Sequence, residues 1–192
     1  MTYVLGLSGS PRREGNTETL LDASLNGARS AGARTSKIIL NELTIAPCQE
    51  CGGCDMTGVC TVRDDMDTVY REVDLSDGII VASPVYFSGV SAQTKAMIDR
   101  FQARWMAKYV LKKAARAGRK KRGVFICAGG STKEDFFLNA RQVISVFFKT
   151  IDVTYAGDLY CGGVEGKGAI TRKEGALDKA FMLGKALVEG IG

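Results

Sequence analysis

The sequence predicts an α/β protein whose strands form a doubly wound parallel sheet with helices on both faces. Two observations predict this class. Five short apolar runs alternate with five longer amphipathic stretches along the whole chain, a pattern typical of βαβ units and a parallel sheet. The run Gly78–Ala82 is uniformly apolar, as a strand buried on both faces is.

The elements follow one another in regular order. Short apolar runs bounded by turn residues predict strands, and longer stretches with apolar residues on one face predict helices. The expected strands are Tyr3–Leu7, Thr35–Leu40, Gly78–Ala82, Gly123–Cys127 and Val153–Leu159. The expected helices are Thr17–Ala31, Met66–Val73, Ala92–Ala107, Lys133–Thr150 and Lys173–Glu189.

The length and composition fit a single domain over residues 1–192. The chain is 45% hydrophobic and 24% charged, which is ordinary for a soluble globular protein. No run approaches the roughly 18–20 apolar residues that span a bilayer. The first residues lack a basic region before the apolar run, so they read as a strand and not as a signal peptide. We therefore expect a cytoplasmic protein without a membrane partner.

A basic segment interrupts the alternation after the third helix. Eight of the fifteen residues from Lys108 to Arg122 are Lys or Arg, and none is acidic. The simplest interpretation is a solvated helix end and loop. The alternative is a docking face for an acidic protein or a nucleotide phosphate. Tyr109 is its one aromatic residue and no nucleic-acid motif accompanies it, so we expect no nucleic-acid partner.

The second interruption is a cysteine cluster at about residues 46–62, after the second strand. Cys48, Cys51, Cys54 and Cys60 have the spacing C-x2-C-x2-C-x5-C. Long loops inside compact domains usually have a function. Iron–sulfur clusters are held by four such thiolates, and C-x2-C-x2-C is a known opening for a [4Fe-4S] site. The spacing therefore favours these four residues as ligands of a [4Fe-4S] cluster.

Other uses of the cysteines remain open at this point. Structural zinc prefers two separated C-x2-C pairs or cysteines combined with histidines, and this chain has no histidine. Disulfides are disfavoured in a cytosolic protein, although thiols that cycle between redox states are an alternative. Cys127 and Cys161 each end an apolar stretch, and they are most simply small buried residues.

The loop after the first strand concentrates groups that bind phosphate. It is neither a dinucleotide fingerprint nor a P-loop. Gly9 and Gly15 allow close backbone approach, and the following helix adds free N–H groups at its N-terminus. The loop's other contributors are Ser8, Ser10, Arg12, Asn16 and Thr17. Because ligands bind at the carboxyl ends of strands in open α/β sheets, we expect a terminal phosphate here.

Two further loops end at the same sheet edge. Ser83–Ser91 follows the third strand and carries Pro84, Tyr86 and Phe87, which can line a flat aromatic ligand. Gly129 and Gly130 follow the fourth strand. Three ligand-compatible loops therefore converge on one crevice.

These residues resemble the flavodoxin-like NADPH-dependent FMN reductase family. The resemblance rests on Gly9–Arg12 with Gly15–Thr17, on Ser83–Phe87, and on Lys95 with Asp99–Phe101. The cysteine loop, with Gly52-Gly53 and Asp64-Asp65-Met66, narrows it to the iron–sulfur flavoproteins. The resemblance covers nearly the whole chain.

The resemblance implies a five-stranded sheet in the order 2-1-3-4-5 and a bound FMN. It places the FMN phosphate at Ser8, Ser10, Arg12, Asn16 and Thr17, with Pro11 in the same loop. It places the isoalloxazine ring near Pro84, Val85, Tyr86, Phe87, Gly129 and Gly130. It also implies a homodimer or homotetramer in which the flavin lies close to a neighbouring subunit.

The function implied is that of an FMN-dependent oxidoreductase with a [4Fe-4S] cluster. Electrons would pass between ferredoxin or NAD(P)H and a small acceptor such as a quinone, oxygen or peroxide. No side chain needs to act as an acid or base, because the cofactors carry the chemistry. One alternative is an NAD(P)H-dependent FMN or quinone reductase whose cysteine loop holds no cluster. Another is a redox-responsive binding module that docks a partner through residues 108–122.

Overall fold

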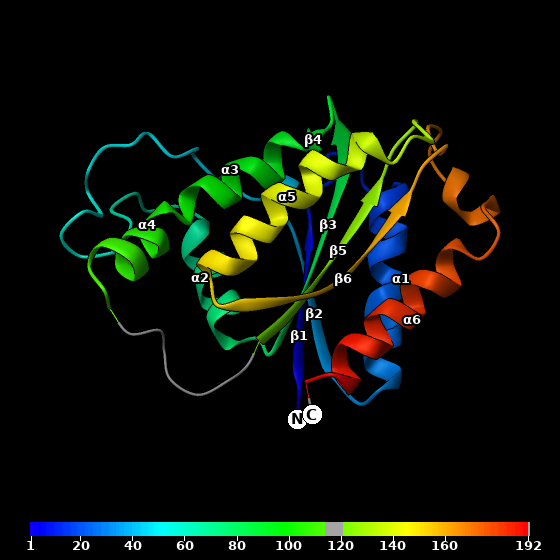
Figure 1. Cartoon of the computed structure of the whole chain (residues 1–192), viewed down its shortest axis with the longest axis horizontal. Coiled ribbons are helices and arrows are strands. Elements are labelled where there is room, and N and C mark those ends of the chain that lie inside the picture. Colours follow the sequence, from blue (N-terminus) through cyan, green and yellow to red (C-terminus); the bar gives the residue numbers. More distant parts are fainter. Residues whose placement is uncertain (114–120, 192) are drawn as a thin grey trace.

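Figure 1 shows the computed structural model of the chain, in which residues 1–113 and 121–191 are described. The five long strands form one sheet in the order β2-β1-β3-β5-β6, and every neighbouring pair is parallel. A short strand, β4, pairs only with β3. When only the five long strands are numbered along the chain, their order across the sheet is 2-1-3-4-5. The predicted α/β class and flavodoxin-like sheet order are therefore confirmed.

All five predicted strands are present. They are β1 (Tyr3–Ser8), β2 (Arg34–Ile39), β3 (Gly78–Tyr86), β5 (Lys121–Ala128) and β6 (Val153–Cys161). β3 is buried as far as Pro84, which accounts for its uniformly apolar sequence. Leu40 was predicted to end the second strand but begins a 3-10 turn, Leu40–Glu42. β3 is longer than predicted, since it runs beyond Ala82 to Tyr86.

The helices form the two outer layers (Figure 1). α1 (Asn16–Ser30) and α6 (Ala176–Glu189) cover one face, and α2 (Met66–Leu75), α3 (Ala92–Arg100) and α5 (Asp135–Thr150) cover the other. A separate buried cluster lies on each face. One contains Leu20, Leu25 and Leu187, and the other contains Met97 and Phe148. Burial of both faces of the sheet explains why the strands alternate with amphipathic helices along the sequence.

The predicted helix Ala92–Ala107 is divided in the structure. α3 ends at Arg100, and α4 (Gln102–Trp105) begins after Phe101 and continues into a π-helical turn, Met106–Val110. Phe101 is buried and packs edge-on against Tyr70 and Phe147, with ring centroids 5.0 Å apart in both pairs. This anchor in the core coincides with the point where one helix gives way to the next.

The last two helices begin later than predicted. α5 starts at Asp135 instead of Lys133. α6 starts at Ala176, after a 3-10 turn at Ala169–Arg172 and after Gly175, whose φ of 65° is left-handed. A left-handed residue favours glycine and interrupts a right-handed helix, which explains why the helix does not begin at Lys173.

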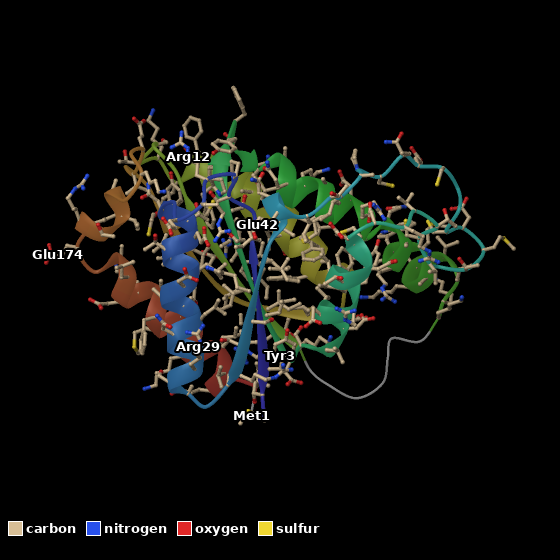
Figure 2. All side chains as sticks on the ribbon, turned by 180° about the vertical axis from the view of Figure 1, so that it is seen from behind. Met1, Tyr3, Arg12, Arg29, Glu42 and Glu174 are labelled. Carbon is tan, nitrogen blue, oxygen red and sulfur yellow. The ribbon has the colours of Figure 1, made fainter. Side chains whose placement is uncertain are left out.

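The carboxyl ends of the parallel strands meet at one edge of the sheet. Figure 2 shows Arg12 at this end of the molecule and Met1 and Tyr3 at the opposite end. The connection that carries the cysteines, drawn in cyan in Figure 1, lies beside α3 and α4. Among the described residues, no helix is both long and apolar enough to cross a bilayer.

Candidate functional site

A cavity of about 300 Å³ opens at the carboxyl ends of the strands. It brings together the loops after β1, β3 and β5 that the sequence predicted to converge. Nine of the twelve predicted FMN contacts line it: Ser10, Arg12, Asn16, Thr17, Pro84, Val85, Tyr86, Gly129 and Gly130. Ser8, Pro11 and Phe87 do not line it.

The cavity also has lining residues beyond the twelve predicted contacts. They are Gly15, which the sequence already placed in the phosphate loop, and Ala128, Val164, Glu165 and Lys167. Three of them belong to a fourth segment, which follows β6 and carries the glycines Gly162, Gly163, Gly166 and Gly168. This segment also begins at the carboxyl end of a parallel strand, so the rule that located the other loops applies to it as well.

The N-terminus of α1 faces this cavity without a side-chain cap. Gly15 occupies the N-cap position in an extended conformation, and no side-chain hydrogen bond caps the helix. The first backbone N–H groups of a helix have no partner within the helix, and together with the helix dipole they form an anion site. Arg12 lines the same cavity. This arrangement fits a phosphate group.

The loop between β1 and α1 is held in shape by its own hydrogen bonds. The Ser10 hydroxyl accepts from the Arg12 N–H and donates to the Arg12 carbonyl, both at 3.1 Å. A Cβ atom at Gly15 would lie 3.0 Å from that carbonyl oxygen, so a larger residue would crowd the turn. Ser8 is buried, and its hydroxyl has no hydrogen-bond partner among the described residues.

Glu18 supports this loop from below. Its buried carboxylate accepts a 2.7 Å hydrogen bond from the Glu14 N–H and contacts Lys37 at 2.8 Å and Arg13 at 3.3 Å. Burial alone would raise the pKa of Glu18, but the bonds from Lys37, Glu14 and Arg13 lower it below its ordinary value. The carboxylate therefore stays charged and fixes Glu14, whose φ of 53° is left-handed.

Asn16 joins α1 to the segment after β6. Its amide nitrogen donates to the carbonyls of Gly166 at 2.9 Å and Val164 at 3.4 Å, and its Oδ1 accepts from the Ile170 N–H at 3.2 Å. Arg12 also reaches this segment, through a 3.4 Å bond from Nη1 to the Glu165 carbonyl. The Asn16 amide thus has a positioning task that the sequence did not indicate.

The aromatic loop after β3 is a hairpin. β3 pairs with β4 (Gly89–Val90), and Phe87 and Ser88 form the turn with φ values of 49° and 61°. Positive φ at both central residues is typical of a two-residue type I′ turn. Tyr86 lines the cavity, whereas Phe87 is fully exposed at the tip. Phe87 is therefore not part of the cavity wall in this chain.

The cysteine connection is tied at its two ends. The Asp65 carboxylate accepts from the Thr44 N–H at 2.7 Å, and the Asp64 carboxylate accepts from the Ala46 N–H at 3.0 Å. The chain between these points turns at Glu50, Gly52 and Gly58, all of which have positive φ. The two aspartates after the cysteines therefore close the loop.

All four cysteines of the loop are free thiols. Cys48 and Cys51 are exposed, and Cys54 and Cys60 are half-buried. Hydrogen bonds from the Gly53 N–H and the Thr61 hydroxyl lower the pKa of Cys51. Burial raises the pKa of Cys54, and so do the charges of Asp55, Cys60 and Cys48. Cys48 and Cys60 therefore both lie within electrostatic range of Cys54.

The four thiols are the donor atoms that an iron–sulfur cluster needs, but their side chains do not converge on a common centre. Four free cysteines on one loop are the donor set that such clusters use. In residues 1–113 and 121–191, however, no group of three Cys, Asp or Glu side chains is arranged closely enough to hold a metal ion. Closure around a cluster thus requires the turns within residues 48–60 to tighten.

Cys127 and Cys161 are buried, as predicted for small core residues. Burial raises the pKa of both thiols. They belong to the two buried clusters on opposite faces of the sheet. Neither is part of the cysteine loop.

A second cavity, of about 770 Å³, lies beside the cysteine loop. Cys48 and Glu50 line one side, and residues of α3, α4 and α5 line the rest, including the apolar Ile98, Trp105 and Val146. The sequence did not indicate this cavity, because it depends on how α5 lies against two helices much earlier in the chain.

The basic segment is largely bonded to its own chain where it is described. Lys108 contacts Asp152 at 2.5 Å, Lys113 donates to the Thr57 carbonyl at 2.6 Å, and Arg122 donates to the Gly190 carbonyl at 3.0 Å. Lys121 donates to the carbonyls of Val73 and Asp74. Arg116, Arg119 and Lys120 lie outside the described residues. The described part favours a structural role over a docking face.

The sequence and the structure were compared with known proteins. The family described as NADPH-dependent FMN reductase matches residues 2–156. An iron-sulfur flavoprotein of Methanosarcina thermophila is 37% identical over 128 residues, which cover 67% of this chain and 63% of that protein. One from Methanocaldococcus jannaschii is 45% identical over 97 residues, half of each chain. One from Archaeoglobus fulgidus is 35% identical over 144 residues, covering 75% of this chain and 70% of that protein.

Solved structures share the fold. An NAD(P)H:quinone oxidoreductase from Methanothermobacter marburgensis has a TM-score of 0.74 at 20% identity, and the match covers 96% of this chain and 95% of that one. A flavone reductase has a TM-score of 0.75 at 19% identity, and the match covers 99% of this chain and 63% of that one. The chain thus spans between half and two thirds of the first two sequence relatives, but nearly the full length of the quinone oxidoreductase.

Proposed function

Because this chain belongs to the NADPH-dependent FMN reductase family, we propose that it is an FMN-dependent oxidoreductase that also carries an iron–sulfur cluster, as the names of its sequence relatives suggest. The cluster type we propose is [4Fe-4S], held by Cys48, Cys51, Cys54 and Cys60. The donor we expect is ferredoxin or NAD(P)H, and the acceptor is a small molecule such as a quinone, oxygen or peroxide.

The observation that carries the flavin half is the cavity at the N-terminus of α1. An uncapped helix end, Arg12 and the hydroxyl-bearing Ser10 and Thr17 meet there. Backbone N–H groups at a helix start and an arginine side chain are suited to a terminal phosphate. On the far side of the same cavity, Pro84–Tyr86 and Gly129–Gly130 offer backbone and flat surfaces that suit the isoalloxazine ring.

The residues of the chain bind and orient, and they need not transfer protons. When bound, FMN exchanges electrons singly or in pairs and a [4Fe-4S] cluster exchanges them one at a time, so a protein with both links one-electron and two-electron reactions. Asn16 and Arg12 hold the segment after β6 over the phosphate end of the cavity. Asp64 and Asp65 hold the two ends of the cysteine loop.

FMN titration of the apoprotein tests the flavin site. We expect Arg12→Gln to weaken FMN binding roughly 10–100-fold, because a hydrogen bond to a charged group contributes about 1.5–3 kcal/mol. Arg29→Gln is the matched control, since Arg29 bonds to Thr35 and Asn26 at the other end of α1 and does not line the cavity. Quenching of flavin fluorescence measures the FMN affinity of both variants. If Arg12→Gln bound FMN as tightly as the unsubstituted protein, Arg12 would not be a phosphate contact.

A second candidate function is an NAD(P)H-dependent FMN or quinone reductase without a cluster. The observation that favours it is the open arrangement of the four thiols within the described residues. Cys51→Ser separates the two functions. NAD(P)H oxidation at the unsubstituted rate, by protein that never contained iron, supports the second candidate. Loss of iron together with loss of electron delivery supports the first.

We also propose that the protein is a homodimer or homotetramer. Exposed apolar side chains support this proposal: Phe87 at the hairpin tip, and Phe136, Leu138 and Val146 on α5. Exposed apolar patches commonly mark protein interfaces. Light scattering coupled to size-exclusion chromatography measures the oligomeric state, and a monomer at all concentrations would contradict the proposal.

A further inference from the structure

Arg100 is a buried arginine whose surroundings connect it to the cysteine loop. It is the last residue of α3, its side chain is 1% exposed, and it is one of the largest fully buried side chains in the described chain. Tyr70 donates a 2.5 Å hydrogen bond to its backbone carbonyl. Buried arginines are rare unless they are paired, because removing the charge from water is costly.

The guanidinium of Arg100 binds the loop on both sides of the cysteines. Nη1 donates to the Ala46 carbonyl at 2.8 Å, two residues before Cys48. Nη1 also contacts the Asp64 carboxylate at 2.5 Å, and Nη2 donates to the Val62 carbonyl at 3.1 Å, both after Cys60. Asp64 in turn accepts from the Ala46 N–H. A single side chain therefore joins the two ends of the loop.

The same side chain lies near a cysteine. Burial would lower the pKa of Arg100, but the Asp64 carboxylate and the nearby Cys60 sulfur raise it above its ordinary value. Its Nε is buried and has no hydrogen-bond partner in the described residues. One carboxylate and two carbonyls thus bind the terminal nitrogens of this buried cation, and its Nε stays without a partner among the described residues.

We propose that Arg100 is a positioning residue of the cysteine loop, which clamps the two ends of the loop and holds its positive charge close to Cys60, two residues before Val62. This inference rests on the proposed iron–sulfur function. Hydrogen bonds to cluster sulfurs and nearby positive charge stabilise the reduced form of a cluster. Arg100 therefore sets how firmly the loop retains iron and raises the potential at which the cluster is reduced.

The test compares Arg100→Gln and Arg100→Lys with a matched control, Arg104→Gln. Arg104 lies one turn further along the chain and pairs with Asp74 at 2.7 Å, away from the cysteines. In anaerobically purified protein, we expect Arg100→Gln to lose iron to a chelator ~10–100-fold faster, the usual effect of removing a residue that supports metal ligands. We expect its cluster to be reduced at a more negative potential, and Arg104→Gln to behave like the unsubstituted protein.

Arg100→Lys separates charge from clamping. A lysine retains the positive charge but cannot bind three acceptors with a planar fork. We expect the reduction potential of the cluster in Arg100→Lys to lie between those of Arg100→Gln and the unsubstituted protein. We expect Arg100→Lys to lose iron about as fast as Arg100→Gln. A residue that only supported the fold would change stability and leave the potential of the remaining cluster unchanged, so an unchanged potential in both variants would overturn the proposal.

Hydrogen exchange of the iron-free protein makes the clamp testable without a cluster. We expect the amides of residues 46–62 to exchange roughly 10–100-fold faster in Arg100→Gln, because hydrogen bonds to a charged group are lost. The amides of β3 report whether the fold is intact. Unchanged exchange in residues 46–62 would overturn the clamp. Unsubstituted protein that binds no iron would instead contradict the proposed function, and this exchange measurement would still decide the clamp.

Discussion

At the scale of single residues, the cavity depends on side chains that hold the backbone of its walls in place. Glu18 is buried beneath the loop after β1 and holds the Glu14 N–H at 2.7 Å. Asn16 uses its amide to hold the segment after β6. Both contacts fix loop backbone whose N–H groups and carbonyls shape the cavity. Loops that carry function are commonly positioned in this way by a rigid scaffold.

We expect Glu18→Gln to lower the free energy of unfolding by about 1–3 kcal/mol at neutral pH, because the charge-assisted bonds from Lys37 and Glu14 are lost. The folded-state pKa of Glu18 is lowered. Its stabilisation is therefore fully present above the unfolded pKa of about 4.3 and is lost as pH falls through the folded pKa.

Urea unfolding at several pH values checks this expectation. The difference between Glu18→Gln and the unsubstituted protein should be widest near neutral pH and should shrink in acid. Asp22→Asn is the control, since Asp22 also contacts Lys37 but is half exposed. If the difference in the free energy of unfolding stayed constant down to low pH, the charge of Glu18 would not be what stabilises the loop.

At the scale of elements, α1 and α6 approach each other closely at two glycines. A Cβ at Gly184 would lie 1.8 Å from the Ser24 carbonyl oxygen, and one at Gly27 would lie 1.9 Å from the Phe181 carbonyl oxygen. Both obstacles are backbone atoms, which cannot move without shifting a helix. The position of α1 relative to the sheet, and with it the direction of its N-terminus, therefore depends on these glycines.

We expect Gly184→Ala to destabilise the protein. Alanine favours a helix over glycine by about 1 kcal/mol, but overpacking against backbone costs typically 1–3 kcal/mol and sometimes more. At a contact of 1.8 Å the second effect should exceed the first. The midpoint of thermal unfolding should fall, as measured by circular dichroism.

Gly166→Ala is the control, because a Cβ there meets nothing within 4 Å and its φ is not left-handed. This variant should unfold at nearly the unsubstituted temperature. A Gly184→Ala protein as stable as this control would mean that α1 and α6 separate without cost.

Sequence reasoning located elements where the signal is local. The uniformly apolar run at Gly78–Ala82 predicted a central strand, and the residues after it predicted a loop that the structure places at the cavity. No glycine or proline marks the helix break at Phe101. The break coincides with the packing of Phe101 against Tyr70 and Phe147, which local sequence does not reveal. The two-residue strand β4 is too short to show the alternation of apolar and polar residues that predicts a strand.

At the scale of the whole molecule, most of the cavity was predictable and the details of its wall were not. Parallel strands end at one edge, so loops after three strands could be grouped before the structure was known. The contacts of Asn16 lie 148 to 154 residues away in the sequence. The link from Arg100 to both sides of the cysteine loop is likewise non-local. Such contacts depend on tertiary packing and have no local sequence signal.

The two sites belong to different parts of the molecule. The cavity proposed for FMN is formed by the strand ends, and the cysteine loop lies beside α3 and α4 (Figure 1). The scaffold between them is the central sheet with α3, whose last residue binds the cysteine loop. We propose that both sites are occupied in one protein.

The most direct test is an assay of flavin, iron and sulfide in anaerobically purified protein, with the visible spectrum recorded before and after dithionite. We expect FMN together with about four iron and four sulfide per chain. We also expect both the flavin bands and the broad cluster absorption to bleach on reduction. Protein that contains FMN but neither iron nor sulfide, even after anaerobic reconstitution, would contradict this proposal.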